Sequence, residues 1–186
     1  MKVESTFSSI GTEPITLSEA KAHLRVSNTQ EDTMITRMIT SAREWAERYC
    51  NRAFIDKTVT QYVSEPGDTT EFDLIHVPVA TITSVKRIDK EGTATTLTLN
   101  TNYWKIGNTE PTIRVTQVFS TDNSYSYEFI YTTSASCPGP VQEAILQIIT
   151  EMWENRAVSK GDYFYFSNTM FNTKQLLNAY RTRIWV

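Results

Sequence analysis

Histidine and cysteine, which carry much of the nucleophilic and metal chemistry of proteins, are scarce in this chain: its 186 residues include two of each. His23 falls in a segment with helical periodicity and His76 in one with strand periodicity, so their spacing indicates no metal site. Cys50 and Cys137 lie far apart and favour two buried free thiols over a disulfide framework. The sequence therefore predicts no catalytic residue, no cofactor, no metal and no enzymatic activity.

Charged pairs in one predicted helix are interpreted as surface. Arg43 with Glu47 and Glu44 with Arg48 are spaced at i,i+4, a pattern that stabilises an exposed helix face by a few tenths of a kcal/mol per pair, about 0.2–0.5. We expect all four side chains to be solvated and to form no site.

Four aromatic residues, Tyr125, Tyr127, Phe129 and Tyr131, alternate along one predicted strand. Such a row can stack single-stranded bases, but a nucleic-acid platform also needs cations, and residues 116–155 contain no Lys or Arg. The formal net charge of −3 likewise disfavours a protein that coats nucleic acid. Core packing of this row is the favoured interpretation, and a single-stranded nucleic-acid-binding module is the less favoured alternative.

Apolar spacing predicts helices on both sides of a central region. Thr16 and Glu19 have the spacing of a capping box, which starts a helix over about 17–24. A longer helix, capped by Asn28 or Thr29, ends at Cys50, and a third runs over about 140–155. The third helix has a wide apolar face, so we expect it to pack against the second helix and at least one other neighbour.

Period-two alternation dominates the region between these helices and predicts short antiparallel strands separated by turns. The expected strands are 58–64, 71–77, 82–89, 95–99, 103–106, 112–119 and 124–131.

The predicted fold class is α+β, a helical bundle with an inserted antiparallel β-sheet or sandwich module and a C-terminal arm. The expected domains are a helical domain over 1–57 plus 135–156, a β module over 58–134, and an arm with a short helix over 157–186. No stretch resembles a signal peptide or a membrane span, so we expect no membrane partner.

The C-terminal arm is aromatic and basic, and its pattern places it outside the core. From Ala157 onward four basic residues face one acid, a local charge of +3, and Asn172 or Thr173 is the expected cap of its short helix. Four consecutive rings rarely lie on a surface without a partner. The predicted interface residues are Tyr163, Phe164, Tyr165, Phe166, Phe171, Leu176, Leu177, Tyr180, Arg181, Arg183 and Trp185.

A series of segments follows in a set order along the chain. They read ITLSEAKAHLRV at 15–26, EDTMI at 31–35, AREWAERYCNRA at 42–53, VPVATITSV at 77–85, VQEAIL at 141–146, WENR at 153–156 and LLNAYR at 176–181. Together, in this order and spacing, they resemble the head-tail connector (adaptor) family of tailed bacteriophages, the type with a β insertion between helices.

The resemblance implies a structural virion protein of the head-tail neck, synthesised in the host cytoplasm. It implies a homo-oligomeric ring, dodecameric in the family, that sits under the portal protein, offers the tail attachment surface and binds a downstream neck, stopper or tail protein. Double-stranded DNA would pass transiently through such a ring. Another neck or tail-completion role is the alternative within the virion.

Overall fold

The computed structural model describes two compact units of the chain. The described residues are 1–9, 11–67, 69–108, 110–116, 125–134, 136–155 and 168–182. The β unit comprises Met1–Gly11, Ile55–Ala135 and Ile184–Val186, and the helical unit comprises Thr12–Phe54 and Ser136–Arg183. The predicted α+β class is confirmed, while the predicted division into three domains stays a prediction.

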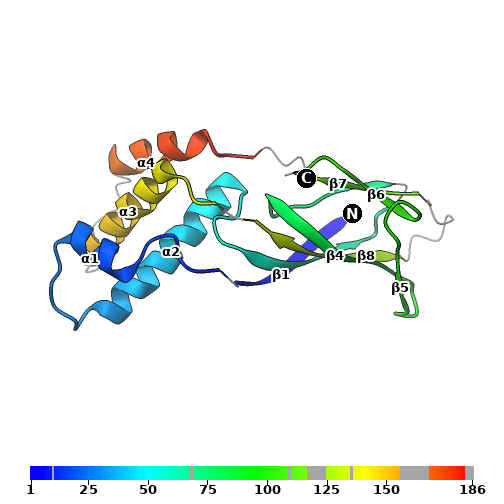
Figure 1. The fold of residues 1–186 in the computed structure, drawn as a ribbon, viewed down its shortest axis with the longest axis horizontal. Coiled ribbons are helices and arrows are strands. Elements are labelled where there is room, and N and C mark those ends of the chain that lie inside the picture. The colour runs from blue at the N-terminus through cyan, green and yellow to red at the C-terminus, as the bar shows by residue number, and fades with distance from the viewer. Residues whose placement is uncertain are drawn as a thin grey trace, which may run out of the picture. The chain divides into compact units, whose positions relative to one another are not determined.

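The helical unit contains α1 (Leu17–Leu24), α2 (Asp32–Cys50), α3 (Gly139–Glu154) and α4 (Asn168–Asn178) (Figure 1). The expected packing of α3 against α2 is confirmed, and α3 also contacts α1 and α4. These helices share one core of aliphatic and small side chains. It is formed mainly by Ile35, Ile39, Ala42, Ala46, Cys50, Val141, Ala144, Ile145, Ile148, Ile149 and Leu177.

Local hydrogen bonds set where the first two helices begin and end. The capping box at Thr16 and Glu19 is present, as predicted. The second helix begins later than expected, at Asp32, because the Asn28 side chain instead accepts the Gln30 backbone N–H (3.2 Å) in a local turn. Asn51 ends α2 in the left-handed conformation (φ 51°) that favours asparagine.

The fourth helix begins before the predicted cap at Asn172 or Thr173. It starts at Asn168, so Thr173 lies inside the helix. Its hydroxyl donates to the Gln147 Oε1 of α3 (3.0 Å). The capping interpretation is therefore wrong, because the hydroxyl of Thr173 serves a contact between helices.

The β unit contains a five-stranded antiparallel sheet and a three-stranded one. The strand orders are β1-β2-β8-β4-β5 and β3-β7-β6. The strands are β1 (Lys2–Ser9), β2 (Lys57–Ser64), β3 (Glu71–Asp73), β4 (Val79–Ile88), β5 (Ala94–Thr96), β6 (Tyr103–Ile106), β7 (Thr112–Val115) and β8 (Ser126–Thr133) (Figure 1).

The first strand has no counterpart in the expectations drawn from sequence. It pairs antiparallel with β2 along its whole length, from Lys2 opposite Ser64 to Ser9 opposite Lys57. Among the described side chains of this strand, only Val3 packs partly against the apolar core of the β unit. This strand is formed by backbone hydrogen bonds and not by side-chain burial. Its apolar residues therefore alternate too weakly for the sequence to predict a strand here.

The aromatic row of β8 faces the core, as predicted. Tyr127, Phe129 and Tyr131 are buried, and Phe72 of β3 packs on the first two rings at centroid distances of 5.0 and 5.7 Å. Tyr125 lies just before β8 and is half-buried, with the Arg87 guanidinium 5.1 Å from its ring centroid. Core packing therefore accounts for the row.

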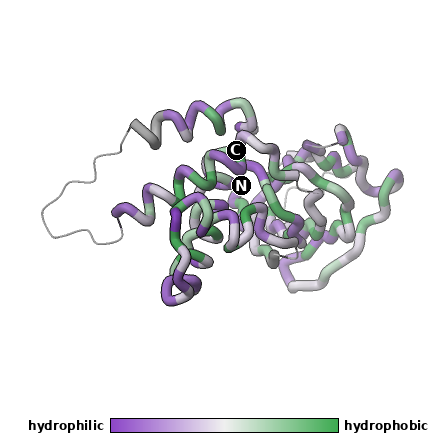
Figure 2. Tube along the Cα trace, turned by 60° about the vertical axis from the view of Figure 1, so that its left-hand side comes forward, coloured by the Kyte–Doolittle hydropathy of each residue, from purple (hydrophilic) through white to green (hydrophobic). Residues whose placement is uncertain are grey.

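No helix in the described part of the chain is long and apolar enough to cross a membrane. Hydrophilic positions interrupt hydrophobic ones along the traced helices (Figure 2).

Candidate functional site

The C-terminal segment of the helical unit is partly built into the core. Leu177 is fully buried among the residues of α2 and α3, and Leu176 and Tyr180 pack partly against the same core. The expectation that this segment lies outside the core pattern is therefore wrong, because α4 supplies a side chain that the α2–α3 pair needs to close its apolar face. The proposed contact residues Leu176, Leu177 and Tyr180 all have intramolecular contacts.

Polar contacts hold the same segment on the C-terminal end of α2. The Tyr49 hydroxyl donates to Asn178 Oδ1 (2.7 Å), and the Thr182 N–H donates to the Cys50 carbonyl (2.8 Å). Arg181 is exposed, and its guanidinium lies 5.6 Å from the centroid of the Tyr49 ring. Among the predicted interface residues whose side chains the structure describes, Arg181 is the exposed one.

A stacked aromatic pair supports this anchor. The Trp45 and Tyr49 rings lie 5.4 Å apart and nearly parallel, at 4°, on successive turns of α2. Both rings are half-buried against the helical core. The C-terminal segment therefore rests on a preorganised aromatic surface.

Several predicted interface residues lie outside what the structure describes. Phe171 lies within α4, and its side chain is not among those described. The others, all outside the described residues, are Tyr163, Phe164, Tyr165, Phe166, Arg183 and Trp185.

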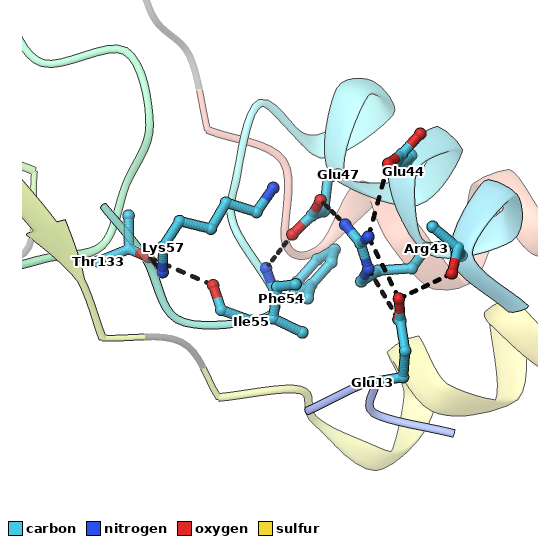
Figure 3. Close-up of polar contacts among 9 residues, drawn as sticks. Glu13, Arg43, Glu44, Glu47, Phe54, Ile55, Lys57 and Thr133 are labelled. Carbon is cyan, nitrogen blue, oxygen red and sulfur yellow. Dashed lines mark hydrogen bonds and ion pairs between the residues drawn. The ribbon is translucent and has the colours of Figure 1, made fainter. Parts of the chain in front are cut away.

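The central polar feature of the helical unit is a buried charge cluster that the sequence interpretation missed. Arg43 and Glu47 were expected to be solvated, yet their side chains are 2% and 8% exposed. Arg43 Nη1 donates to Glu47 Oε2 (2.6 Å), and Arg43 Nε donates to Glu13 Oε2 (2.8 Å) (Figure 3). In the other predicted pair, Glu44 with Arg48, both side chains are exposed. Glu44 Oε1 lies 3.6 Å from Arg43 Nη2.

The cluster also binds backbone and hydroxyl groups. Glu47 Oε1 accepts the Phe54 N–H (2.7 Å), and Glu13 Oε1 accepts the Thr40 hydroxyl (3.0 Å) and a second guanidinium N–H of Arg43 (3.3 Å). Burial acts to lower the pKa of Arg43, but hydrogen bonding and attraction to Glu13 and Glu47 outweigh it and raise that pKa. Arg43 therefore remains a cation inside the helical unit.

One signal in the sequence could have pointed to this cluster. Ala42 and Ala46 mark the apolar face of α2, and Arg43 and Glu47 directly follow them, so both lie at the edge of that face. The partner Glu13 lies in a segment without periodicity, and no local pattern connects it to α2.

The residues considered for chemistry stay apart. No group of three metal-ligating side chains gathers among the described residues. Burial raises the pKa of Cys50 to about 11 and that of Cys137 to about 12, which keeps both thiols protonated and weakly nucleophilic. His76 shares a hydrogen bond with Ser5 (3.1 Å) and packs near Phe7.

Exposed apolar side chains on the β unit are scattered along its sequence. Phe7, Leu99 and Ile106 are 47%, 48% and 40% exposed. Single exposed apolar residues are common on protein surfaces, so these three define no site by themselves.

The structure is that of an α+β protein in which the cluster of Glu13, Arg43 and Glu47 joins segments of the same chain by hydrogen bonds. A model of the phage gp6-like head-tail connector protein family matches residues 14–105 of this chain. The match spans α1, α2 and the strands from β2 as far as Lys105 in β6, and it leaves out β1. The predicted family is thereby confirmed.

Solved structures share the fold over nearly the whole chain. A chain from the neck of an empty gene transfer agent particle, described with C6 symmetry, is 17% identical with a TM-score of 0.70. A chain from the virion of the native particle is 16% identical with a TM-score of 0.70, and one from its neck with C12 symmetry is 18% identical with a TM-score of 0.67. Each alignment covers 97% of both chains. No curated protein sequence matches this chain.

Proposed function

We propose that this chain is a non-enzymatic structural subunit of the virion neck. It acts as a head-tail connector (adaptor), and copies of it form a ring beneath the portal protein. The observation that carries this proposal is the match to the connector family model, together with a fold shared with neck chains over 97% of the sequence.

The ring is supported by the symmetry of the related particles. Structures containing chains of this fold are described with C6 and C12 symmetry. Heterologous contacts that close on rotation are the physical route from one such chain to a ring. We propose a dodecamer in which each copy binds one neighbour through one surface and the other neighbour through a different surface.

The charge of the chain is compatible with a DNA conduit. The formal net charge is −3, and a channel that lets double-stranded DNA slide must avoid the clustered cations that bind phosphates. We therefore propose that DNA passes this protein transiently and is not held by it.

We place the partner contacts at the C-terminal end of the helical unit. Arg181 is exposed on the Tyr49 ring, and the residues that follow Thr182 include Arg183 and Trp185. An exposed arginine beside aromatic side chains is the composition of a protein interface. The portal or a neighbouring copy is the proposed partner here, and a downstream neck, stopper or tail protein binds elsewhere on the ring.

Co-purification with the portal protein tests this placement. Wild-type protein and two charge reversals, Arg181→Glu and the matched control Arg37→Glu on the exposed face of α2, are mixed with tagged portal. We expect wild type and Arg37→Glu to be retained and Arg181→Glu to be retained at least roughly ten-fold less, since reversing one interfacial charge costs several kcal/mol, about 2–5.

The outcomes separate the competing roles. Wild-type protein that ignores portal but binds a downstream tail component would favour a tail-completion role. Salt-dependent retention on single-stranded DNA, with no binding to portal, would instead favour the nucleic-acid alternative.

A further inference from the structure

The chain passes between the β unit and the helical unit at defined junctions. It enters the helical unit between Gly11 and Thr12, and it leaves between Phe54 and Ile55. Glu13 is the second residue after the first junction, and Phe54 is the last residue before the second. Neither residue belongs to a helix, so no helical hydrogen bonds hold these positions.

Both positions are held by neighbouring turns of α2. Arg43 donates to both carboxylate oxygens of Glu13, at 2.8 and 3.3 Å. Glu47, one turn further along α2, accepts the Phe54 N–H at 2.7 Å. The bond from Arg43 to Glu47 (2.6 Å) joins the two contacts into one continuous network (Figure 3).

The energetics favour a geometric role for this network. Burying charges costs desolvation free energy, and apolar side chains of similar volume often stabilise a core equally well. A guanidinium has donors in a rigid, planar fork, so it fixes two carboxylates in direction as well as in distance. An apolar replacement would fill the volume but would leave the Phe54 N–H without its carboxylate partner.

We propose that Glu13, Arg43 and Glu47 form a junction clamp, which holds the two segments where the chain enters and leaves the helical unit in one fixed geometry on α2. The clamp defines where both connections to the β unit begin. Its contribution is local order at the junctions, in addition to any effect on the stability of the helical core.

A third connection ends close in sequence to Cys137, whose thiol is affected by the charge of Glu47. The chain re-enters the helical unit at Ser136, and the next residue is Cys137. Burial is the main cause of the raised pKa of Cys137, and the charge of Glu47 adds to it, which indicates that this thiol lies within electrostatic range of the clamp.

Amide hydrogen exchange on the full-length chain tests the clamp. The variants are Glu13→Gln and Glu47→Gln, which remove one charge and retain nearly the same volume. We expect the amides of Phe54, and those of residues 12–16 other than the proline at position 14, to exchange roughly ten-fold faster or more, because their local opening no longer breaks a charge-assisted hydrogen bond. The amides of Ile145, Ile148 and Ile149 in α3 should keep their wild-type rates.

Two controls separate a clamp from general stability. Glu44→Gln removes an exposed carboxylate from the same helix and should leave exchange at Phe54 unchanged. Ile148→Val loosens the core away from the clamp and should accelerate exchange throughout α3. If the clamp variants accelerate α3 as Ile148→Val does, or leave Phe54 and residues 12–16 at wild-type rates, the proposal is wrong.

The test stays informative if one variant fails to fold. Glu13 is 31% exposed, so water can solvate Arg43 in Glu13→Gln, and that variant alone reports on residues 12–16. Exchange is measured on the unassembled chain, so a failure of the clamp is distinct from a failure of the proposed ring.

Discussion

The two units of this protein solve the same packing problem with different chemistry. In the helical unit, irregular segments are held by charged side chains, the buried Arg43 and Glu47 and the partly exposed Glu13. In the β unit, the irregular segment after β3 is held by neutral groups. Gln61 Nε2 donates to the Asp73 carbonyl (2.9 Å), and Gln61 Oε1 accepts the Ile75 N–H (3.1 Å).

The neutral network extends to β8. The Tyr131 hydroxyl donates to Gln61 Oε1 (3.3 Å) and accepts the His76 N–H (3.1 Å). Loss of one member of a charged network leaves an uncompensated buried charge, whereas loss of one neutral member leaves an unpaired amide or hydroxyl. We therefore expect a single substitution of a network residue to destabilise the helical unit more than the β unit.

The largest expected effect is at Arg43. Arg43→Met should lower the free energy of unfolding by about 3–5 kcal/mol, because the carboxylates of Glu13 and Glu47 would lose the guanidinium that donates to both of them. Urea denaturation followed by circular dichroism measures the change. Glu44→Gln is the control and should cost under about 1 kcal/mol, since that carboxylate is exposed. Equal effects of the two substitutions would contradict the buried cluster.

The next effect tests whether α4 belongs to the helical core. Leu177→Ala should cost about 2–5 kcal/mol, because this side chain is fully buried. Leu176→Ala, at the neighbouring half-buried position, is the control and should cost less. Thermal unfolding of both variants measures the difference. A melting temperature that Leu177→Ala leaves unchanged would restore the interpretation of this segment as an arm outside the core.

A smaller effect is expected in the β unit. Gln61→Leu should cost about 1–3 kcal/mol, since it leaves the Ile75 N–H, the Asp73 carbonyl and the Tyr131 hydroxyl without this partner. Denaturation in urea gives the value, with Thr60→Val on the same strand as control. A loss larger than that of Arg43→Met would reverse the proposed order of the two networks.

The smallest expected effect is a difference between the two units in the alkaline pH at which each begins to lose stability. Burial raises the pKa of Cys50 and Cys137 from near 9.0 to about 11 and about 12, so the folded helical unit holds these protons more tightly than the unfolded chain does. The contribution of these two thiols to the free energy of unfolding is complete below about pH 9. It is lost as the pH rises through their pKa values in the folded protein. In the β unit burial raises the pKa of Tyr127 and Tyr131 from 10.0, so the corresponding loss starts about one unit higher.

Hydrogen exchange measured at a series of alkaline pH values, corrected for the intrinsic rate, resolves this order. The amides of α3 should lose protection before those of β8. Cys50→Ala should reduce the pH dependence in the helical unit while leaving that of the β unit unchanged. Loss of protection in β8 first would contradict the assignment.

Periodicity predicted the elements that bury one regular face. The first helix and β6 occur at the predicted residues, and α3 differs by one residue at each end. The same reasoning missed β1, because that strand is defined by pairing with β2 and buries little apolar surface. Local patterns report side-chain burial, and they report backbone pairing only indirectly.

The buried cluster shows a second reason for the misses. An Arg–Glu pair at i,i+4 looks the same in sequence whether it is solvated or buried, and what decides is a partner 30 residues away, Glu13. Thr173 is similar, since its role depends on Gln147 of α3 and not on its own neighbours. Contacts between distant segments are set by the packing of the helices, which a single sequence does not display.

Electron microscopy of the purified protein, alone and mixed with the portal protein of the same virion, tests the central claim most directly. The account predicts closed rings of this chain seated coaxially on the portal, either preformed or assembled only when the portal is present. Particles that remain monomeric with portal at micromolar concentrations, while the portal ring itself is intact, would contradict the proposal of a connector ring.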